Sequence, residues 1–271
     1  MAFTQRAWVL VLAAAGLLSA QSSKLNPGSQ MEMLKQVAFE QKLNTQLPLE
    51  LVFRDEEGRS VALKQFFHKK PVILAPVYYE CPMLCDLTMS GLVKALRTLR
   101  LDAGKDFDVI MLSFNPRETP VVAADKKKAY LKRYNRPGTE HGWHFLTGDE
   151  PQIRALTEAM GFRYVYDPTT KQYAHAAGIV IATPEGRLSR YIFGMDPSAR
   201  DVRLGLVESA QGRVGDPVAQ LLLMCFHYDP AGGKYTLNVL TAVRLAGALT
   251  VALMGGFLIV NLRRERRQRV G

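Results

Sequence analysis

Two stretches of strand length, both rich in apolar residues, constrain the fold most. Residues 71–78 (PVILAPVY) form a continuous apolar run, and residues 107–113 (FDVIMLS) form a second run with one acidic residue. A strand that is buried on both faces has this pattern, which is typical of the centre of a parallel sheet. Residues 87–99, between the two runs, repeat apolar positions at helical spacing and supply the crossover that parallel strands require. The chain is therefore predicted to contain an α/β domain.

The middle of the chain continues this alternation. A hairpin is indicated by short strands at 49–53 and 60–63 on either side of a turn sequence, DEEG. Further helices are expected over residues 121–134, 150–160 and 201–211, and further strands over 145–147, 176–183 and 189–193. This order predicts one central sheet with helices on both faces. The sequence has neither an internal repeat nor a glycine-rich phosphate loop, which argues against nucleotide chemistry.

Composition and charge exclude other classes of protein. With 48% hydrophobic and 22% charged residues the chain is too apolar to be disordered, and 3 cysteines are too few for a disulfide-stabilised scaffold. The formal net charge is +10. Half of it comes from Arg6 and the arginine-rich C-terminal tail, so we interpret it as a signal of membrane topology and expect no nucleic-acid partner.

The N-terminus has the pattern of a secretory signal peptide, which we assign to residues 1–20. Arg6 precedes an apolar run over residues 7–18, and Ser19 and Ala20 supply small residues before a cleavage site. An uncleaved anchor is the alternative, although the run is short for a membrane span. Residues 21–48 are polar and mixed, and we assign them to an N-terminal extension.

The C-terminus has the pattern of a membrane anchor. Residues 245–262 (LAGALTVALMGGFLIVNL) carry no charge, and the assigned transmembrane helix covers 239–262. The basic tail at 263–271 predicts a cytoplasmic C-terminus by the positive-inside rule. We therefore expect a single-pass protein of the cell membrane whose main domain faces outward, into the periplasm of a bacterium, with residues 213–238 as a juxtamembrane segment.

Cys81 and Cys85 are candidates for chemistry because of their position. They lie in the sequence ECPMLC, directly after the strand at 71–78 and before the helix at 87–99. A helix N-terminus stabilises a thiolate, and a separation of four residues places both sulfurs on one side of a helical turn. The pair can share a metal or form a disulfide. The alternative is that both pack as small hydrophobic residues.

His175 is the residue that discriminates between these uses. It precedes the apolar strand at 176–183, in the sequence YAHAAG. Two thiolates and an imidazole form a soft ligand set that suits Cu(I) and is compatible with Cu(II) and one further ligand, whereas structural zinc sites have four ligands. A structural histidine at the start of a strand is the alternative.

Cys225 and His227 form a second candidate pair, in the sequence LMCFHYDP before the anchor. A helix is expected to begin at Asp216-Pro217 and to end before Asp229-Pro230. On a helix, residues two apart do not share a face, which favours packing of Cys225 and exposure of His227 at the membrane surface. If the helix unwinds before residue 229, the two side chains form an auxiliary soft-metal site.

Several segments together resemble the SCO/SenC family. They are the strand followed by Cys81-Pro82-x-x-Cys85, the segment SFNPRETP at 113–120, WHFLTG at 143–148, the tyrosine-rich stretch before His175 and the hairpin after it. The resemblance implies a thioredoxin-like domain over residues 49–212, and it implies that Cys81, Cys85 and His175 are copper ligands.

The sequence departs from the family pattern at three points. Asn115 and Glu118 stand where the family has aspartates, with one residue fewer between Pro116 and Thr119. Ala176 follows the histidine where serine is common, and the anchor is C-terminal where many members have an N-terminal one. We expect the first two departures to alter local hydrogen bonding and to leave the metal ligands intact.

The resemblance implies a metallochaperone, which is not an enzyme. It would deliver copper to the dinuclear copper centre of a haem–copper (cytochrome c) oxidase subunit. The alternative is a membrane-tethered thiol–disulfide reductase that acts on cysteines of the same subunit and needs Cys81 and Cys85 but not His175. A peroxiredoxin-like peroxidase is disfavoured, because Pro76 and Cys81 do not fall in the Pro-x-x-x-Thr-x-x-Cys register.

Overall fold

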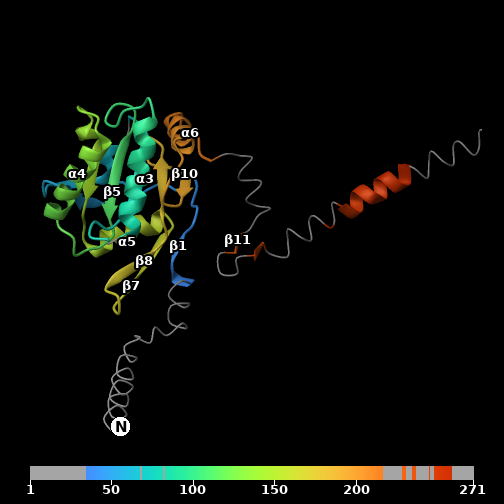
Figure 1. Cartoon of the computed structure of the whole chain (residues 1–271), viewed down its shortest axis with the longest axis horizontal. Coiled ribbons are helices and arrows are strands. Elements are labelled where there is room, and N and C mark those ends of the chain that lie inside the picture. Colours follow the sequence, from blue (N-terminus) through green and yellow to red (C-terminus); the bar gives the residue numbers. More distant parts are fainter. Residues whose placement is uncertain are drawn as a thin grey trace, which may run out of the picture. The chain divides into compact units, whose positions relative to one another are not determined.

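The protein is described here by a computed structural model that covers residues 35–67, 69–81, 83–215, 228–229, 234–235, 244 and 247–257 (Figure 1). The chain forms two compact units. One comprises the described residues within Met1–Ala38 together with Arg163–Ala176, and the other comprises the described residues within Phe39–Phe162 and Ala177–Gly271. The predicted signal peptide at 1–20 and the pair Cys225 and His227 lie outside the described residues.

A five-stranded sheet forms the centre of the larger unit, in the order β10-β9-β4-β5-β6. The strands β4, β5 and β6 are parallel, β9 is antiparallel to β4, and β10 is antiparallel to β9. Every residue of β4, β5 and β9 is buried, as expected of central strands. The bounds are Val72–Val77 (β4), Asp108–Ser113 (β5), Trp143–Leu146 (β6), Gly178–Ala182 (β9) and Leu188–Phe193 (β10).

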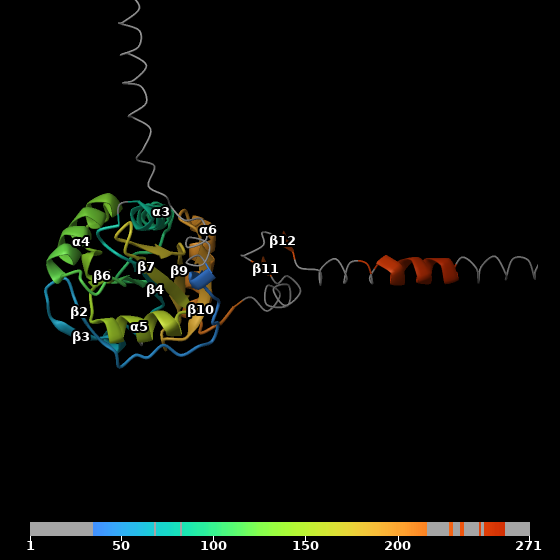
Figure 2. The ribbon, with the colours of Figure 1, turned by 90° about the horizontal axis from the view of Figure 1, so that it is seen from below.

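Helices cover both faces of this sheet, as the sequence predicts. The helices α3, α4 and α6 lie on one face and α5 lies on the other (Figure 2). The crossovers that join β4 to β5 and β5 to β6 run through α3 and α4, the arrangement that parallel strands require. The bounds are Leu84–Thr98 (α3), Pro120–Tyr134 (α4), Glu150–Ala159 (α5) and Ala199–Ala210 (α6).

The predicted hairpin at 49–63 is present as β2 (Val52–Arg54) and β3 (Ser60–Ala62), which pair antiparallel. Two 3-10 helices, η1 (Leu63–Phe66) and η2 (Glu140–Gly142), complete the connections. The chain before the hairpin also packs on the domain. Leu47 is buried, and its amide donates to the carbonyl of Gly186 at 2.9 Å.

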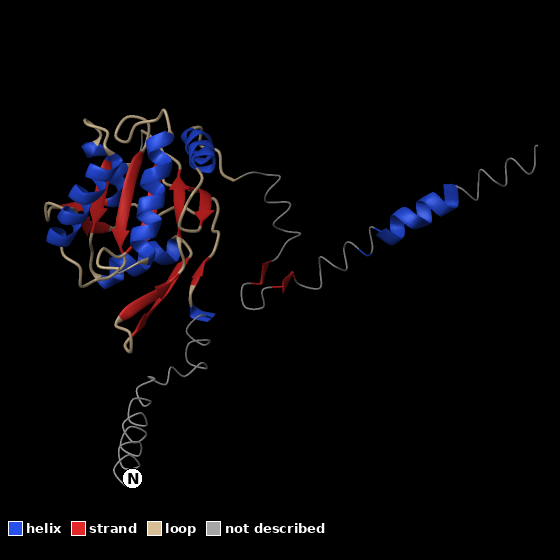
Figure 3. Ribbon diagram, viewed as in Figure 1, coloured by secondary structure: helices blue, strands red, loops and turns tan. Residues whose placement is uncertain are grey.

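A second sheet, which was not expected from the sequence, has three strands in the order β1-β7-β8 (Figure 3). Its bounds are Ala38–Phe39 (β1), Phe162–Asp167 (β7) and Gln172–His175 (β8). The strands β7 and β8 form an antiparallel hairpin in which Tyr164 pairs with His175. His175 therefore ends a strand of this hairpin, in addition to preceding the apolar strand β9.

The C-terminal part of the chain is described only in pieces. The two-residue strands β11 (Tyr228–Asp229) and β12 (Lys234–Tyr235) pair antiparallel, and residues 247–257 are helical. Among the described residues, no helix is both long enough and apolar enough to cross a membrane. The transmembrane helix at 239–262 stays a prediction, and the structure describes only residue 244 and residues 247–257 of it.

Candidate metal centre

Cys81 and Cys85 lie where strand β4 passes into helix α3. Cys81 is in the loop that follows the strand, and Cys85 is the second residue of the helix, which begins three residues before its predicted start. Both cysteines are buried and neither forms a disulfide. The end of a strand that leads into a helix N-terminus is where open α/β sheets place ligands.

Backbone amides point at both sulfurs. The N–H of Tyr78 donates to Sγ of Cys85 at 3.4 Å, and the N–H of Cys85 donates to Sγ of Cys81 at 3.3 Å. Met83, the N-cap residue of α3, makes no side-chain capping bond, so the sulfur of Cys81 satisfies one of the free amides of the first helical turn. These donors stabilise negative charge on the sulfurs and prepare the pair for a cation.

Burial raises the pKa of the Cys85 thiol well above its usual value. The hydrogen bond with Cys81 raises it further, whereas the Tyr78 amide opposes the shift. Without a metal the thiol of Cys85 is therefore protonated at neutral pH. A metal ion that binds here replaces that proton, because the thiolate is the ligand.

His175 supplies the imidazole group of the candidate metal centre. Its Nδ1 lies 2.9 Å from the carbonyl oxygen of Ala176. In the tautomer that suits this contact, Nδ1–H donates to the carbonyl and the lone pair is on Nε2, which is then the nitrogen that binds a metal. Tyr173 makes edge-on ring contacts with Tyr164 and Tyr166, at 5.7 and 5.1 Å between centroids, so aromatic rings order the hairpin that carries the histidine.

The ligand atoms of Cys81, Cys85 and His175 lie within 4.8 Å of one another. The structure thus brings together the three residues that the sequence singles out. Two sulfurs and one nitrogen suit Cu(I), which accepts three soft ligands, and the set is one ligand short of a structural zinc site.

Glu118 holds the loop before Cys81, a role that the sequence did not reveal. Its buried carboxylate accepts hydrogen bonds from the backbone amides of Tyr79 and Glu80, both at 2.8 Å, and from the hydroxyl of Ser113 at 2.5 Å. Burial raises the pKa of this carboxyl, and the three donors oppose the shift. Glu118 thereby fixes the two residues that directly precede Cys81. The only signal in the sequence was its place in the SFNPRETP segment.

Tyr79 fixes the same loop from the other side. Its hydroxyl lies 2.8 Å from the carbonyl oxygen of Met111 in β5 and 2.9 Å from that of Leu146 in β6, and its one hydrogen can be donated to either. The side chain is fully buried, and burial raises its pKa well above the usual value. The loop that carries Cys81 is therefore tied both to the sheet and to the segment before α4.

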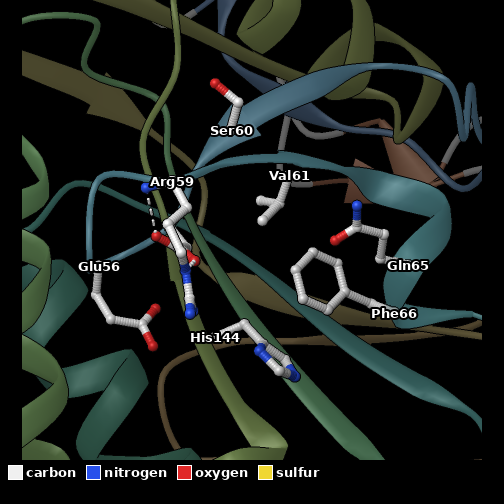
Figure 4. Close-up of a pocket in the computed structure, with 8 residues that line it drawn as sticks. Glu56, Arg59, Ser60, Val61, Gln65, Phe66 and His144 are labelled. Carbon is white, nitrogen blue, oxygen red and sulfur yellow. Dashed lines mark hydrogen bonds and ion pairs between the residues drawn. The ribbon is translucent and has the colours of Figure 1, made fainter.

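A cavity of about 330 Å³ lies elsewhere, between the β2–β3 hairpin and β6 (Figure 4). None of the residues that line it belongs to the cysteine–histidine group. His144 and Phe66 are in ring contact, with centroids 4.3 Å apart, and Arg59 forms an ion pair with Asp55. The lining mixes acidic, basic and aromatic groups: Asp55, Glu56, Arg59, Ser60, Val61, Gln65, Phe66 and His144.

The family model for SCO1/SenC matches residues 40–203. The chain belongs to the SCO1/SenC family. This confirms the resemblance seen in the sequence, and with it the thioredoxin-like domain. None of the curated proteins matches the chain.

Solved structures resemble this domain. An Aquifex aeolicus protein provisionally assigned to electron transfer is 27% identical, with a TM-score of 0.55 over 64% of this chain and 96% of that one. A SCO1/SenC lipoprotein of Bacillus anthracis is 15% identical, with a TM-score of 0.51 over 63% of this chain and 98% of that one, and shares the fold. ScoI of Arabidopsis thaliana, solved with copper bound, is 18% identical, with a TM-score of 0.48 over 60% of this chain and 96% of that one.

Proposed function

We propose that this protein is a copper metallochaperone that holds Cu(I) through Cys81, Cys85 and His175. The observation that carries the proposal is the approach of the three ligand atoms to within 4.8 Å of one another. Membership of the SCO1/SenC family supports copper as the metal and oxidase assembly as the process. The client we propose is the subunit of a haem–copper oxidase that contains the dinuclear copper centre.

The residues around the group have separate tasks in this function. Cys81 and Cys85 bind the metal as thiolates and release their protons on binding. His175 supplies the third ligand from a different segment of the chain. Glu118 and Tyr79 keep the Cys81 loop in place, so the thiol pair stays positioned when no copper is bound. Transfer then requires that ligands of the client take the place of these three residues on the metal.

We further propose that the domain faces outward and is tethered by residues 239–262. The apolar side chains within the helical residues 247–257 support this: Leu249, Val251, Leu253, Met254 and Phe257 are exposed. Protease added to intact spheroplasts should digest the main domain and spare a tag placed after residue 271. Protection of the domain would contradict this topology.

A thiol–disulfide reductase is the second candidate, because the sulfurs of Cys81 and Cys85 lie within 4.8 Å of each other and two cysteines so placed can form a disulfide. Burial raises the pKa of the Cys85 thiol, so Cys81 would have to be the attacking thiol of a reductase, since the thiolate is the nucleophile. A reductase also has no use for His175.

Copper content of the reduced full chain, purified anaerobically in detergent, tests the proposal. Cys225→Ser/His227→Ala serves as the background, so that only the main group is counted. We expect one equivalent of Cu(I), lost in Cys81→Ala and in Cys85→Ala, and weaker Cu(II) binding in His175→Ala. Copper spectra that are unchanged in His175→Ala, together with persistent dithiol reductase activity, would favour the reductase.

A further inference from the structure

Met83 lies between the two cysteines and is exposed. It is the N-cap residue of α3, and 67% of its surface is accessible to solvent. One helical turn further, Leu87 is 47% exposed, and its amide bonds to the carbonyl of Met83 at 3.0 Å. A large apolar side chain so exposed has no packing role in the core. Single exposed apolar residues are common on protein surfaces, but Met83 is singled out by its place between the two proposed ligands.

Chain geometry allows the thioether of Met83 to reach a metal held by the cysteines. Met83 is two residues from each of them, so its Cα is at most about 7 Å from either cysteine Cα. The side chain has three flexible bonds and ends in a soft, polarisable sulfur. Thioether sulfur is a ligand that Cu(I) prefers over harder metals.

The three ligands of the proposed site differ in how easily they can be replaced. Cys81 and Cys85 share one turn and are linked through the Cys85 amide. His175 comes from the β7–β8 hairpin and is anchored through Ala176. The imidazole can therefore leave the metal without any change in the cysteine loop, provided that another donor takes its place.

We propose that Met83 is a transient Cu(I) ligand that replaces His175 while copper enters or leaves the site. This inference rests on the proposed copper-binding function. In the step, the Met83 sulfur donates a lone pair to Cu(I) and the His175 nitrogen withdraws its own. Copper remains Cu(I) throughout, and no electron or proton is transferred. Because Met83 is exposed, a partner protein can reach its sulfur.

Removal of the His175 imidazole allows the role of the Met83 sulfur to be tested separately. In His175→Ala, Met83 is expected to complete a three-ligand site with the two cysteines. Adding Met83→Leu removes the thioether but keeps an apolar side chain of similar volume. We expect the double variant to bind Cu(I) more weakly than His175→Ala by about tenfold or more, at least the loss that removal of an outer-shell partner causes.

The measurement is competition with a chromophoric Cu(I) chelator, under anaerobic reducing conditions, on the full chain with Cys225→Ser/His227→Ala. Met195, which is 43% exposed, provides the matched control, and Met195→Leu in the His175→Ala background should leave the affinity unchanged. With selenomethionine in place of methionine, X-ray absorption at the copper edge should show a copper–selenium contact in His175→Ala that Met83→Leu removes.

The outcomes separate this inference from the proposed function. Equal Cu(I) affinity in His175→Ala and the double variant would overturn the role of Met83 but not the copper-binding function. The absence of a copper–selenium contact in the X-ray absorption of His175→Ala would have the same meaning. If the unaltered chain binds no Cu(I), both the metallochaperone function and this inference fall. A tenfold loss of Cu(I) affinity in the Met195→Leu control as well would also overturn the assignment of Met83 as a ligand, because the loss would then not be specific to Met83.

Discussion

The backbone N–H of Cys85 donates to the sulfur of Cys81, with 3.3 Å between nitrogen and sulfur. One proposed ligand is thus the capping group of the helix that carries the other. The start of α3 and the geometry of the thiol pair are therefore coupled, and a change in the chemical state of either sulfur reaches both.

Oxidation is expected to compete with copper. A two-electron oxidant converts the two thiols to a disulfide, with loss of two protons, and a disulfide has no thiolate to offer a metal. We expect the oxidised chain to lose Cu(I) and to regain it after reduction. Competition with a Cu(I) chelator before and after dithiothreitol treatment measures this, in the Cys225→Ser/His227→Ala background. Equal binding in both redox states would show that the cysteines are not the ligands.

Glu118→Gln should destabilise the loop before Cys81. The carboxylate accepts from Tyr79 N–H, Glu80 N–H and the Ser113 hydroxyl, and an amide group cannot accept all three. A loss of about 2 kcal/mol in the free energy of unfolding is expected, together with weaker Cu(I) binding. Urea denaturation and chelator competition measure the two effects.

The control for that experiment is Glu50→Gln. Glu50 is exposed and pairs with Lys64 at 2.9 Å, an arrangement that contributes less than about 1 kcal/mol. A Glu118→Gln variant no less stable than Glu50→Gln would contradict the role of Glu118 as the residue that positions the loop.

His144 should make the domain sensitive to mild acid. Burial lowers the pKa of His144 from 6.5 to about 4. The imidazole takes up a proton near pH 6.5 in the unfolded chain but only near pH 4 in the folded chain. The contribution of His144 to stability is therefore fully present above pH 6.5, and it is lost as the pH falls from 6.5 to about 4. The expected loss in the free energy of unfolding is on the order of 3 kcal/mol. The charged and titratable groups that act on the ring are Glu56, Lys70, Asp108, Lys127 and His141.

Urea denaturation of the full chain between pH 7 and pH 4 tests this, with His144→Phe as the comparison. The unaltered chain should lose stability relative to His144→Phe as the pH falls. Parallel curves for the unaltered chain and His144→Phe would show that His144 is not the group responsible.

The central sheet could be predicted because its signals are local. The apolar runs at 71–78 and 107–113 became β4 and β5, and the Pro-Glu-Gly turn at 184–186 separates β9 from β10. The start of α3 was placed too late. No side chain with a strong capping preference precedes Leu84, and the group that binds the free amide of Cys85 is a cysteine sulfur.

The hairpin β7–β8 could not be predicted in the same way. Most of its residues are only half-buried, so no apolar run marks it. Its order comes from cross-strand pairs such as Tyr166 with Tyr173. Glu118 was missed for a related reason: the amides that it binds are 38 and 39 residues away, and no spacing in the sequence reveals such a contact.

Gly91→Ala should weaken both the fold and the copper site. Gly91 is in the middle of α3, and a Cβ there would lie 2.1 Å from the carbonyl oxygen of Met195. That oxygen belongs to the backbone and cannot rotate away, so α3 or the Met195 segment has to shift. Overpacking of this kind costs about 1–3 kcal/mol. Because α3 carries Cys85, we also expect a loss of Cu(I) affinity.

Gly138→Ala separates this steric effect from backbone strain. Gly138 has a φ of +84° and no atom within 4 Å of an added Cβ. Its replacement by alanine should cost about 1 kcal/mol through strain alone and leave Cu(I) binding unchanged. Urea denaturation and chelator competition on both variants give the comparison. If Gly91→Ala lowers stability without any effect on Cu(I) affinity, the position of α3 does not control the thiol pair, and the Cys81 loop alone sets the geometry of the site.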